Sequence, residues 1–402
     1  MNPNLILAIL ILATSVAMMS TDLYAPSLPH LPDLFGTTPE SVKLTVSLNV
    51  LAYALATLVH GPLSERFGRR PVLLWGIAAF TLFSLLCALS QTIGQLITVR
   101  VFQGLAAAVE GVVVLAIIRD VFTDREQVRA LALYGVATAL TPIVAPIIGG
   151  YVHVFFGWRM NFHALAAVAF IVTILIWRYL EESGVRDADA LRPREIIGDY
   201  LGVLSNRNYL CYVIIGGATV GFFFAFITAG PFILIHGHGV PTQHFGYYQG
   251  SLVVAYSLGS LLAGRLARRH PGENIMMIGV AAVLIGGAAL LYVIYVGPEN
   301  PYTLMAALCL IAFGDGPVFA TTPALAMKAT DRRTGPAAAM LLAIEVGIGS
   351  LAALAVTLFH DGTSRPLAVT TIVLCALVVA ALLVRKKGTD RDIGSVPGLS
   401  SP

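Results

Sequence analysis

Five ionisable side chains lie inside long apolar stretches of the sequence. They are four acids and one base: Asp22, Arg100, Glu110, Asp315 and Glu345. A charge at the centre of a membrane-spanning helix costs about 2.5–3.5 kcal/mol, so such a side chain normally faces a cavity or a partner. A carboxyl group in that setting can bind and release a proton, or pair with a cationic solute. We therefore predict that these five residues couple protons or bind substrate.

Each residue of the first half also has a structural alternative. Asp22 can be a helix end wetted by an outer vestibule. Arg100 can tune a nearby carboxylate, or it can be a hub that binds backbone carbonyls of neighbouring helices. Glu110 follows Arg100 by ten residues, about 15 Å along a helix, so the two cannot pair directly. Glu110 then lines a lower cavity, or is a neutral carboxyl held by a neighbouring hydroxyl or amide.

The two acids of the second half leave a similar choice open. Asp315 stands between two glycines and just before Pro317, so its helix is expected to bend there and the acid can cap the freed amides. Glu345 stands near the middle of its stretch, among glycines that let another helix pack closely. Tyr24 and Phe226 are candidates for the wall of a substrate cavity. For Phe226, a ring that simply faces lipid is the alternative.

The elements that must position these residues are membrane-spanning helices. Of the 402 residues, 57% are hydrophobic and 12% are charged, whereas a soluble domain has about 25% charged residues. Twelve apolar stretches are each about long enough to cross a bilayer: 5–23, 42–63, 71–90, 95–118, 130–152, 160–180, 209–235, 246–265, 274–296, 302–327, 335–358 and 366–384. We predict an all-α integral membrane protein with twelve transmembrane helices.

The basic residues predict the orientation of these helices. All lysines and arginines outside the spans fall in the loops of one side, except Lys43, Arg159 and Arg365. By the positive-inside rule, this asymmetry places both termini in the cytoplasm. The first apolar stretch lacks a small-residue cleavage site, so it is expected to be a retained helix. The expected location is the inner (cytoplasmic) membrane.

The longest polar interval divides the chain into two halves. We predict an N-terminal six-helix bundle over 1–180, a cytoplasmic linker with a short surface helix over 181–208, a C-terminal six-helix bundle over 209–387 and a disordered cytoplasmic tail over 388–402. A degraded repeat supports this division. The basic segment 263–269 follows the eighth span as a longer basic segment follows the second, but without its acid.

Several function classes are excluded by composition and by missing motifs. The net charge of +3 comes from residues spread over many loops, so no nucleic-acid-binding surface is predicted. The four cysteines lie in apolar stretches without a C-x-x-C pair, so neither a metal site nor a disulfide framework is expected. No cofactor is expected. The sequence has no H-E-x-x-H, G-x-S-x-G or G-x-x-x-x-G-K-S/T pattern, so neither an enzyme nor an ATP-driven pump is expected.

The segment Gly61–Pro71, with the sequence GPLSERFGRRP, is predicted to be a short cytoplasmic loop between the second and third spans. Its spacing resembles the loop signature of the major facilitator superfamily, although Glu65 stands where that family usually has aspartate. The resemblance implies a latch for the outward-open state, formed with an acid at the end of the fourth span. The residues concerned are Gly61, Glu65, Arg66, Gly68, Arg69 and Asp120.

Three further motifs resemble the same family. Arg100 lies in LITVRVFQG, which resembles the intramembrane arginine motif. Pro146, Gly149 and Gly150 resemble the P-x-x-G-G motif that marks antiporters. The stretch Asp22–Pro29 resembles the D-x-Y-x-P-x-x-P pattern of the Bcr/CflA subfamily of drug:proton antiporters, which includes phenicol exporters. The resemblance covers the whole chain and implies two pseudo-symmetric six-helix bundles.

Proton-coupled export of small amphipathic drugs by alternating access is the function that this resemblance implies. The expected partners are a small-molecule substrate, protons and the lipid bilayer, and the chain is expected to be a monomer. Export of a metabolite such as a nucleoside or an amino acid is the alternative within transport, because the same machinery would serve it. A sensor that binds a ligand without transporting it is a further alternative.

Overall fold

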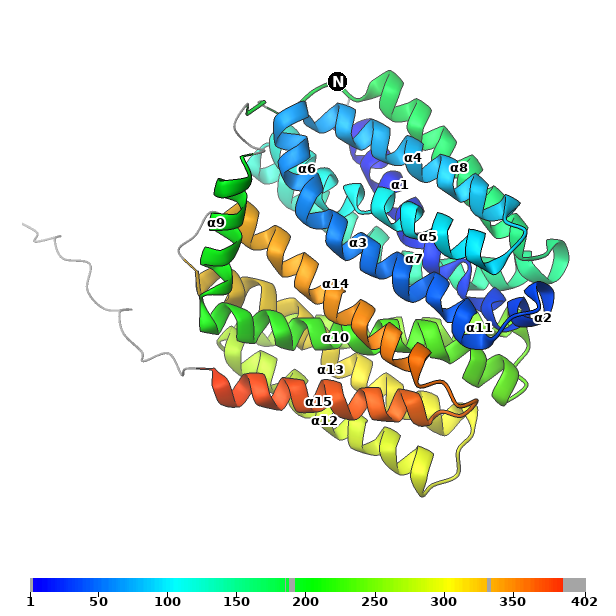
Figure 1. Cartoon of the computed structure of the whole chain (residues 1–402). Helices are drawn as coiled ribbons and strands as arrows, with labels where there is room; N and C mark the ends of the chain where they lie inside the picture. Colours follow the sequence, from blue (N-terminus) through cyan, green and yellow to red (C-terminus); the bar gives the residue numbers. More distant parts are fainter. Residues whose placement is uncertain (1–2, 185, 188–191, 331–333, 386–402) are drawn as a thin grey trace, which may run out of the picture.

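The computed structural model describes residues 3–184, 186–187, 192–330 and 334–385. The regular elements of these residues are helices, whose arrangement is drawn in Figure 1. The tail predicted at 388–402, and the last residues of the predicted C-terminal bundle, lie outside the described ranges.

A long helix, or a succession of helices, occupies each of the twelve predicted spans. In the first half these are α1 (Pro3–Asp22), α3 (Pro39–Phe67), α4 (Arg69–Leu89), α5 (Ile93–Ala107) continued by η2 (Glu110–Val114) and α6 (Leu115–Val121), α7 (Asp124–Phe156) and α8 (Trp158–Tyr179). In the second half they are α10 (Arg207–Pro231) continued by η3 (Phe232–Gly237), α11 (Phe245–Leu266), α12 (Gly272–Tyr295), α13 (Pro301–Lys328), α14 (Thr334–Leu358) and α15 (Arg365–Val384). The all-helical membrane fold is therefore confirmed.

One of these twelve helices is less apolar than the others. Eleven helices within the described ranges are long and apolar enough to cross a membrane. The remaining predicted span is α11, which has 22 residues and includes a glutamine, Gln249. It packs along α7 and α13, so its polar side chains can meet helices instead of lipid.

The two halves of the chain lie side by side. The helices of the first half gather in the upper part of Figure 1 and most of those of the second half in the lower part. The linker forms α9 (Pro193–Leu204), the predicted surface helix, at one end of the long helices. Two helix pairs form the seam between the halves, because α3 packs along α14 and α7 packs along α11. Side chains on these four helices can therefore meet the opposite half.

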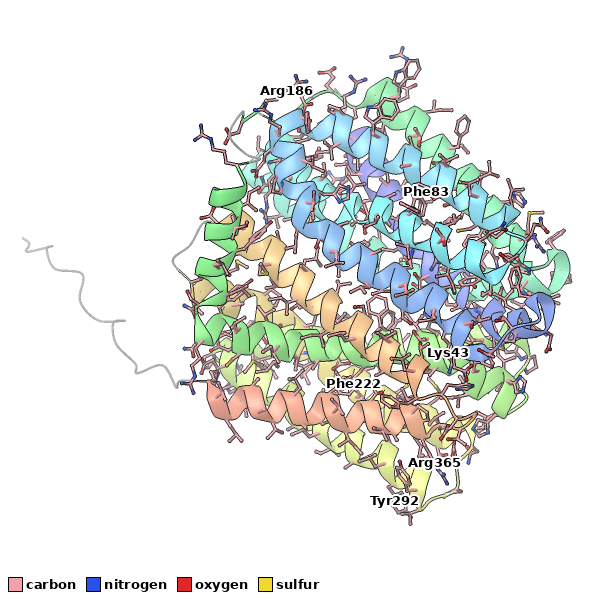
Figure 2. All side chains as sticks on the ribbon, in the orientation of Figure 1. Lys43, Phe83, Arg186, Phe222, Tyr292 and Arg365 are labelled. Carbon is pink, nitrogen blue, oxygen red and sulfur yellow. The ribbon has the colours of Figure 1, made fainter. Side chains whose placement is uncertain are left out.

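Basic residues mark the two ends of the molecule. Figure 2 shows Arg186 of the linker at one end and Lys43 and Arg365 at the other. The charge pattern of the loops had assigned Arg186 to one side of the membrane and the other two residues to the opposite side. We refer to these ends as the linker end and the Lys43 end.

The prediction of a loop over Gly61–Pro71 is wrong. Helix α3 continues through Pro62 to Phe67, and α4 begins at Arg69, so Gly68 alone separates the two helices. The φ angle of Gly68 is 102°, a conformation open to glycine and rarely adopted by residues with a Cβ atom. A single glycine in this conformation reverses the chain, so no longer loop is needed.

Candidate functional site

Asp22 is the last residue of α1, and its side chain is only 4% exposed. The chain continues as a 3-10 helix, η1 (Ala25–His30), whose Pro26 has no N–H to extend the α-helix. The Oδ1 atom of Asp22 accepts a hydrogen bond from Nε2 of Gln249 on α11 at 2.8 Å. The acid of the first half is thus joined to the second half across the seam. This burial does not agree with a helix end wetted by solvent.

Glycines of α7 and α11 bring the backbones around this contact close together. A Cβ atom built on Gly149 would lie 1.9 Å from the carbonyl oxygen of Leu23, and one built on Gly246 would lie 2.4 Å from the backbone nitrogen of Ile147. A Cβ atom built on Gly150 would lie 2.8 Å from the carbonyl oxygen of Thr242 in η4 (Thr242–His244). The P-x-x-G-G motif therefore lies where α1, α7 and α11 meet, beside the acid of α1.

Arg100 is fully buried, and its hydrogen bonds go to uncharged oxygen atoms. It donates to the carbonyl oxygens of Thr45 at 3.2 Å and Ser20 at 3.1 Å, and to Oε1 of Gln103 at 2.6 Å. The ion pairs found among the described residues do not include Arg100. Arg100 thus ties α1, α3 and α5 together and is not the direct partner of Asp22.

Glu110 begins η2, a π-helical segment that interrupts the fourth span. Its side chain is buried, and the hydroxyl of Tyr53 on α3 donates to its Oε1 atom at 3.1 Å. The Oε2 atom is buried without a hydrogen-bond partner. Single π-helical turns are rare overall, but those that occur often lie at functional sites. Nothing in the apolar pattern of this span had indicated the π-helical turn.

The acids of the second half are also buried, each with one oxygen atom that has no partner. These atoms are Oδ1 of Asp315 on α13 and Oε1 of Glu345 on α14. A Cβ atom built on Gly216 of α10 would lie 2.4 Å from Oε1 of Glu345 and 2.8 Å from Oγ1 of Thr322, which also lacks a partner. Helix α13 runs without interruption past Pro317, and the Oδ1 atom of Asp315 accepts no hydrogen bond from amides of this helix.

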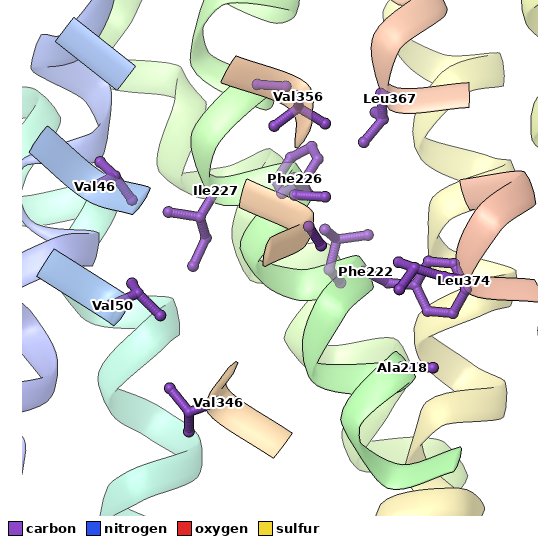
Figure 3. Packing of buried hydrophobic residues seen from close by; sticks show 14 of the residues in the cluster. Val46, Val50, Ala218, Phe222, Phe226, Ile227, Val346, Val356, Leu367 and Leu374 are labelled. Carbon is purple, nitrogen blue, oxygen red and sulfur yellow. The ribbon is translucent and has the colours of Figure 1, made fainter. Parts of the chain in front are cut away.

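The two aromatic candidates pack in the protein interior. Phe226 is 1% exposed and stacks on Phe245 of α11 with ring centroids 6.1 Å apart. Figure 3 shows Phe226 close to Val356. Tyr24 is also 1% exposed, and its hydroxyl lies 3.2 Å from Oγ1 of Thr45. Neither ring faces lipid in this conformation.

Two grooves at the surface are not lined by any of these residues. One groove of about 540 Å³ lies between α4 and α8, and another of about 370 Å³ lies between α10 and α15. Both lie on helices other than the four that form the seam. The predicted acids are instead enclosed among helices.

At the linker end, Arg69 and Asp120 form an ion pair with 3.3 Å between Nε and Oδ2. The guanidinium of Arg69 also donates to Oγ of Ser64 at 2.5 Å. Glu65 takes part through its backbone, because its carbonyl oxygen accepts from the N–H of Asp187 at 2.9 Å. This cluster joins the α3–α4 turn to the end of α6 and to the linker.

We expect Asp120→Asn to shift the protein only modestly towards the conformation open at the linker end. The side chains of Arg69 and Asp120 are 17% and 29% exposed, and such pairs contribute roughly 0.2–1 kcal/mol. The ratio of the two conformations should change no more than about fivefold. Distances between spin labels at Arg129 and Arg268 would measure it. A change above about tenfold would mean that this pair is stronger than an exposed ion pair.

Glu182 caps α4 from the linker, a role that we had not predicted. Its Oε1 atom accepts from the backbone N–H groups of Arg69 at 2.8 Å and Arg70 at 3.4 Å. A carboxylate at a helix N-terminus is favoured by the free amides and the helix dipole. A Cβ atom built on the neighbouring Gly68 would lie 2.2 Å from Oε2 of Glu182, so a side chain there would displace this carboxylate.

Lys43 and His360 join the halves at the Lys43 end. Lys43 is 2% exposed, and its Nζ atom lies 2.7 Å from Nδ1 of His360 in the loop after α14. One helical turn further along α3, Oγ of Ser47 lies 3.0 Å from Oγ1 of Thr357. An ammonium group can only donate, so Nδ1 of His360 must be unprotonated to accept.

This contact is expected to weaken in acid. Burial and the charge of Lys43 lower the pKa of His360 below its usual value, against the smaller raising effects of two nearby acids. The hydrogen bond between Lys43 and His360 is therefore fully formed at neutral pH and is lost as the pH falls through this lowered pKa. Spin labels at Asp33 and Thr363 should show about a fivefold larger open fraction in acid, because one hydrogen bond is lost. His360→Gln keeps an acceptor that does not titrate, so this variant should lose the part of the pH dependence that comes from His360.

Three partners escaped prediction from the sequence: Gln249, Glu182 and His360. They lie 227, 113 and 317 residues from the groups that they bind. No local pattern connects positions so far apart. A glutamine within a span was nevertheless an available signal, because a buried amide needs partners.

Comparison with known proteins agrees with this architecture. The family model of the Major Facilitator Superfamily matches residues 10–354. A chloramphenicol resistance protein of Pseudomonas aeruginosa is 26% identical over 94% of this chain and 90% of its own length. A bicyclomycin resistance protein homolog of Haemophilus influenzae is 26% identical over 93% of each chain. The solved structure of a bacterial homolog of the human lysosomal transporter Spinster, inward-facing and unoccupied, matches with a TM-score of 0.74 and 14% identity over 96% of this chain and 97% of that one.

The resemblance found in the sequence is confirmed by these comparisons. The matched region includes more than half of the chain, and the relatives bear the drug-resistance names that the motifs had implied. Twelve long helices in this order form a transporter that acts on small molecules within the membrane. The chain belongs to the Major Facilitator Superfamily.

Proposed function

We propose that this transporter exports small amphipathic drugs in exchange for protons. The relatives named for resistance to chloramphenicol and bicyclomycin support this class of substrate. The observation that supports proton coupling is the position of Asp22, a buried acid whose hydrogen bond reaches Gln249 of the other half. An acid in this place can change the balance between two conformations when it gains or loses a proton.

The proton gradient would supply the energy for export. Moving one charge across the membrane yields about 2.3 kcal/mol per 100 mV. Glu110, Asp315 and Glu345 are further candidates for the proton route, because each has a buried oxygen atom without a partner. In this proposal Arg100 holds the helices around Asp22 in place through its bonds to backbone oxygens.

Alternating access would come from rocking of the halves about the seam. The proposed rigid units are the bundles 1–180 and 209–387, joined by the linker 181–208 and working as a monomer. Hydrogen-bonded contacts join the halves at the Lys43 end and would break when that end opens. They include Asp22–Gln249, Lys43–His360, Ser47–Thr357 and His30–Thr242. The ion pair of Arg69 and Asp120 is the proposed latch at the linker end.

We further propose that the linker end faces the cytoplasm of a bacterial inner membrane. The excess of basic residues in the loops of that end supports this orientation. Single cysteines replacing Arg268 and Asp33, in a background without the four native cysteines, should react with an impermeant reagent from opposite sides. Labelling of both from outside intact cells would contradict the orientation.

Proton release on substrate addition tests the proposed exchange. Purified transporter in weakly buffered solution should release protons when chloramphenicol is added, and proteoliposomes should accumulate the drug only when a proton gradient is imposed. Nucleosides and amino acids serve as comparison substrates in the same assay. A response confined to these metabolites would reassign the substrate, and binding without counterflow would identify a sensor.

A further inference from the structure

Gln249 stands at the centre of the contact between Asp22 and the second half. Its side chain is fully buried. Its Nε2 atom donates to Oδ1 of Asp22 at 2.8 Å and lies 3.4 Å from the carbonyl oxygen of Pro142 on α7. Its Oε1 atom is buried and has no hydrogen-bond partner. A buried acceptor without a partner is uncommon in folded proteins, and here it lies on the same amide group that binds the acid.

The backbones around this amide lie close together. A Cβ atom built on Gly149 would meet the backbone of Leu23, and one built on Gly246 would meet the backbone of Ile147. An amide group has a donor side and an acceptor side of nearly equal size, and a half-turn of the group exchanges them. Gln249 can therefore present either an N–H group or a carbonyl oxygen to the same acid.

Three charged or titratable groups on the elements around Asp22 have hydrogen bonds of their own. Arg100 binds backbone oxygens, His30 binds Thr242 at 2.8 Å, and His153 binds Ser27 at 3.0 Å. The other such groups on or next to α1, η1, η2, α3, α7, α8, α11 and α13 include Tyr24, Lys43, Tyr53, Glu110, Tyr134, Tyr151, Arg159, His163, His244, Tyr247, Tyr248, Tyr256 and Asp315. The ion pairs of the described chain do not include Asp22. The amide of Gln249 is thus the group placed to respond to its charge.

We propose that Gln249 is a positioning residue that lets Asp22 release its proton while the Lys43 end stays closed. The ionised acid accepts a charge-assisted hydrogen bond from Nε2, as the structure has it. The protonated acid donates its O–H to Oε1 after a half-turn of the amide. In the release step the O–H bond of Asp22 breaks, the proton passes to water, and the electron pair stays on the carboxylate. The inference rests on the proposed function, because it assigns a partner to the same acid.

An infrared titration of the full-length protein in nanodiscs tests this assignment without any substrate. The absorption of the protonated carboxyl group of Asp22 is obtained as the difference between the wild type and Asp22→Asn over a range of pH. Gln249→Met removes the donor to the carboxylate with little change in volume. The pH midpoint of the Asp22 signal should rise by about one to two pH units in this variant, because the ionised form loses its hydrogen bond. In Gln249→Glu, the pH midpoint of the Asp22 signal should rise at least as far, because two acids then share one site.

The matched control is Gln91→Met, which makes the same chemical change at an exposed position. It should leave the midpoint unchanged. Gln249→Asn keeps an amide of shorter reach and should give an intermediate shift, so the test remains available if one variant fails to fold. A midpoint within about 0.3 pH units of wild type in both Gln249→Met and Gln249→Glu would overturn the inference.

Failure of the proposed function has a different signature. If Asp22 titrates and Gln249→Met shifts its midpoint, but the wild type releases no protons on drug addition, then the exchange is wrong and the positioning role stands. If the wild type exchanges drug for protons and Gln249→Met changes neither the midpoint nor the coupling, then only the role of Gln249 is wrong.

Discussion

The Asp22→Asn variant should lose uphill export while it still binds a neutral substrate. Asparagine resembles the protonated acid in shape and keeps an acceptor for Gln249, so the fold and the closed Lys43 end should persist. It cannot release a proton, so substrate-induced proton release should fall to background and export against a gradient should stop. Downhill equilibration of a neutral drug should continue. Proton release from purified protein and counterflow in proteoliposomes measure the two effects separately.

Glu110→Gln and Glu345→Gln are the parallel controls for this variant. Both replace a buried acid with an amide of the same length. If either of them abolishes proton release while Asp22→Asn does not, the coupled proton belongs to that acid instead. Normal uphill export by Asp22→Asn would leave Asp22 with a purely structural role.

The Gly150→Val variant should be unable to close the Lys43 end. Overpacking of a tight interior costs typically about 1–3 kcal/mol. Here the Cβ atom would lie 2.8 Å from the carbonyl oxygen of Thr242 in the second half, and the clash is with backbone atoms, so the cost should reach the upper end of that range. About 3 kcal/mol changes the ratio of closed to open molecules roughly 100-fold. Spin labels at Asp33 and Thr363 should report a mainly open Lys43 end, and export should cease.

The control for this variant lies on the same helix. Gly135 has no atom within 4 Å of a built Cβ, so Gly135→Val makes the same change in helix propensity without a steric clash. We expect Gly135→Val to fold, to close and to export. If both variants behave alike, the effect comes from the stiffness of α7 and not from its contact with the second half.

The helices and their order could be predicted because membrane spans depend on local composition. Any stretch of about twenty apolar residues must satisfy its backbone hydrogen bonds internally, and this requirement needs no knowledge of neighbours. The loop over Gly61–Pro71 was the exception. A proline normally weakens a helix, but α3 continues through Pro62 as far as Phe67, and a single glycine ends it.

The sequence was enough to predict which acids are buried, but it was not enough to predict what they contact. Asp22 and Glu345 were recognisable because charge is expensive inside a membrane. Their partners depend on which helices meet, and that depends on the packing of surfaces far apart in the chain. The π-helical turn at Glu110 is of the same kind, because it changes a hydrogen-bond register without changing the apolar composition of the span.

The close approach at Gly150 and Gly246 has a consequence for how this protein can evolve. The contact that they allow is between backbones, so it requires only that these positions stay without a side chain. Side chains elsewhere, such as Tyr24 and Phe226, can then be exchanged without altering the way in which the halves meet. Selection by a new toxic compound can therefore change which substrates are preferred, while the residues that form the contact between the halves stay the same. Drug-resistance carriers built in this way can diverge in what they expel sooner than in how they work.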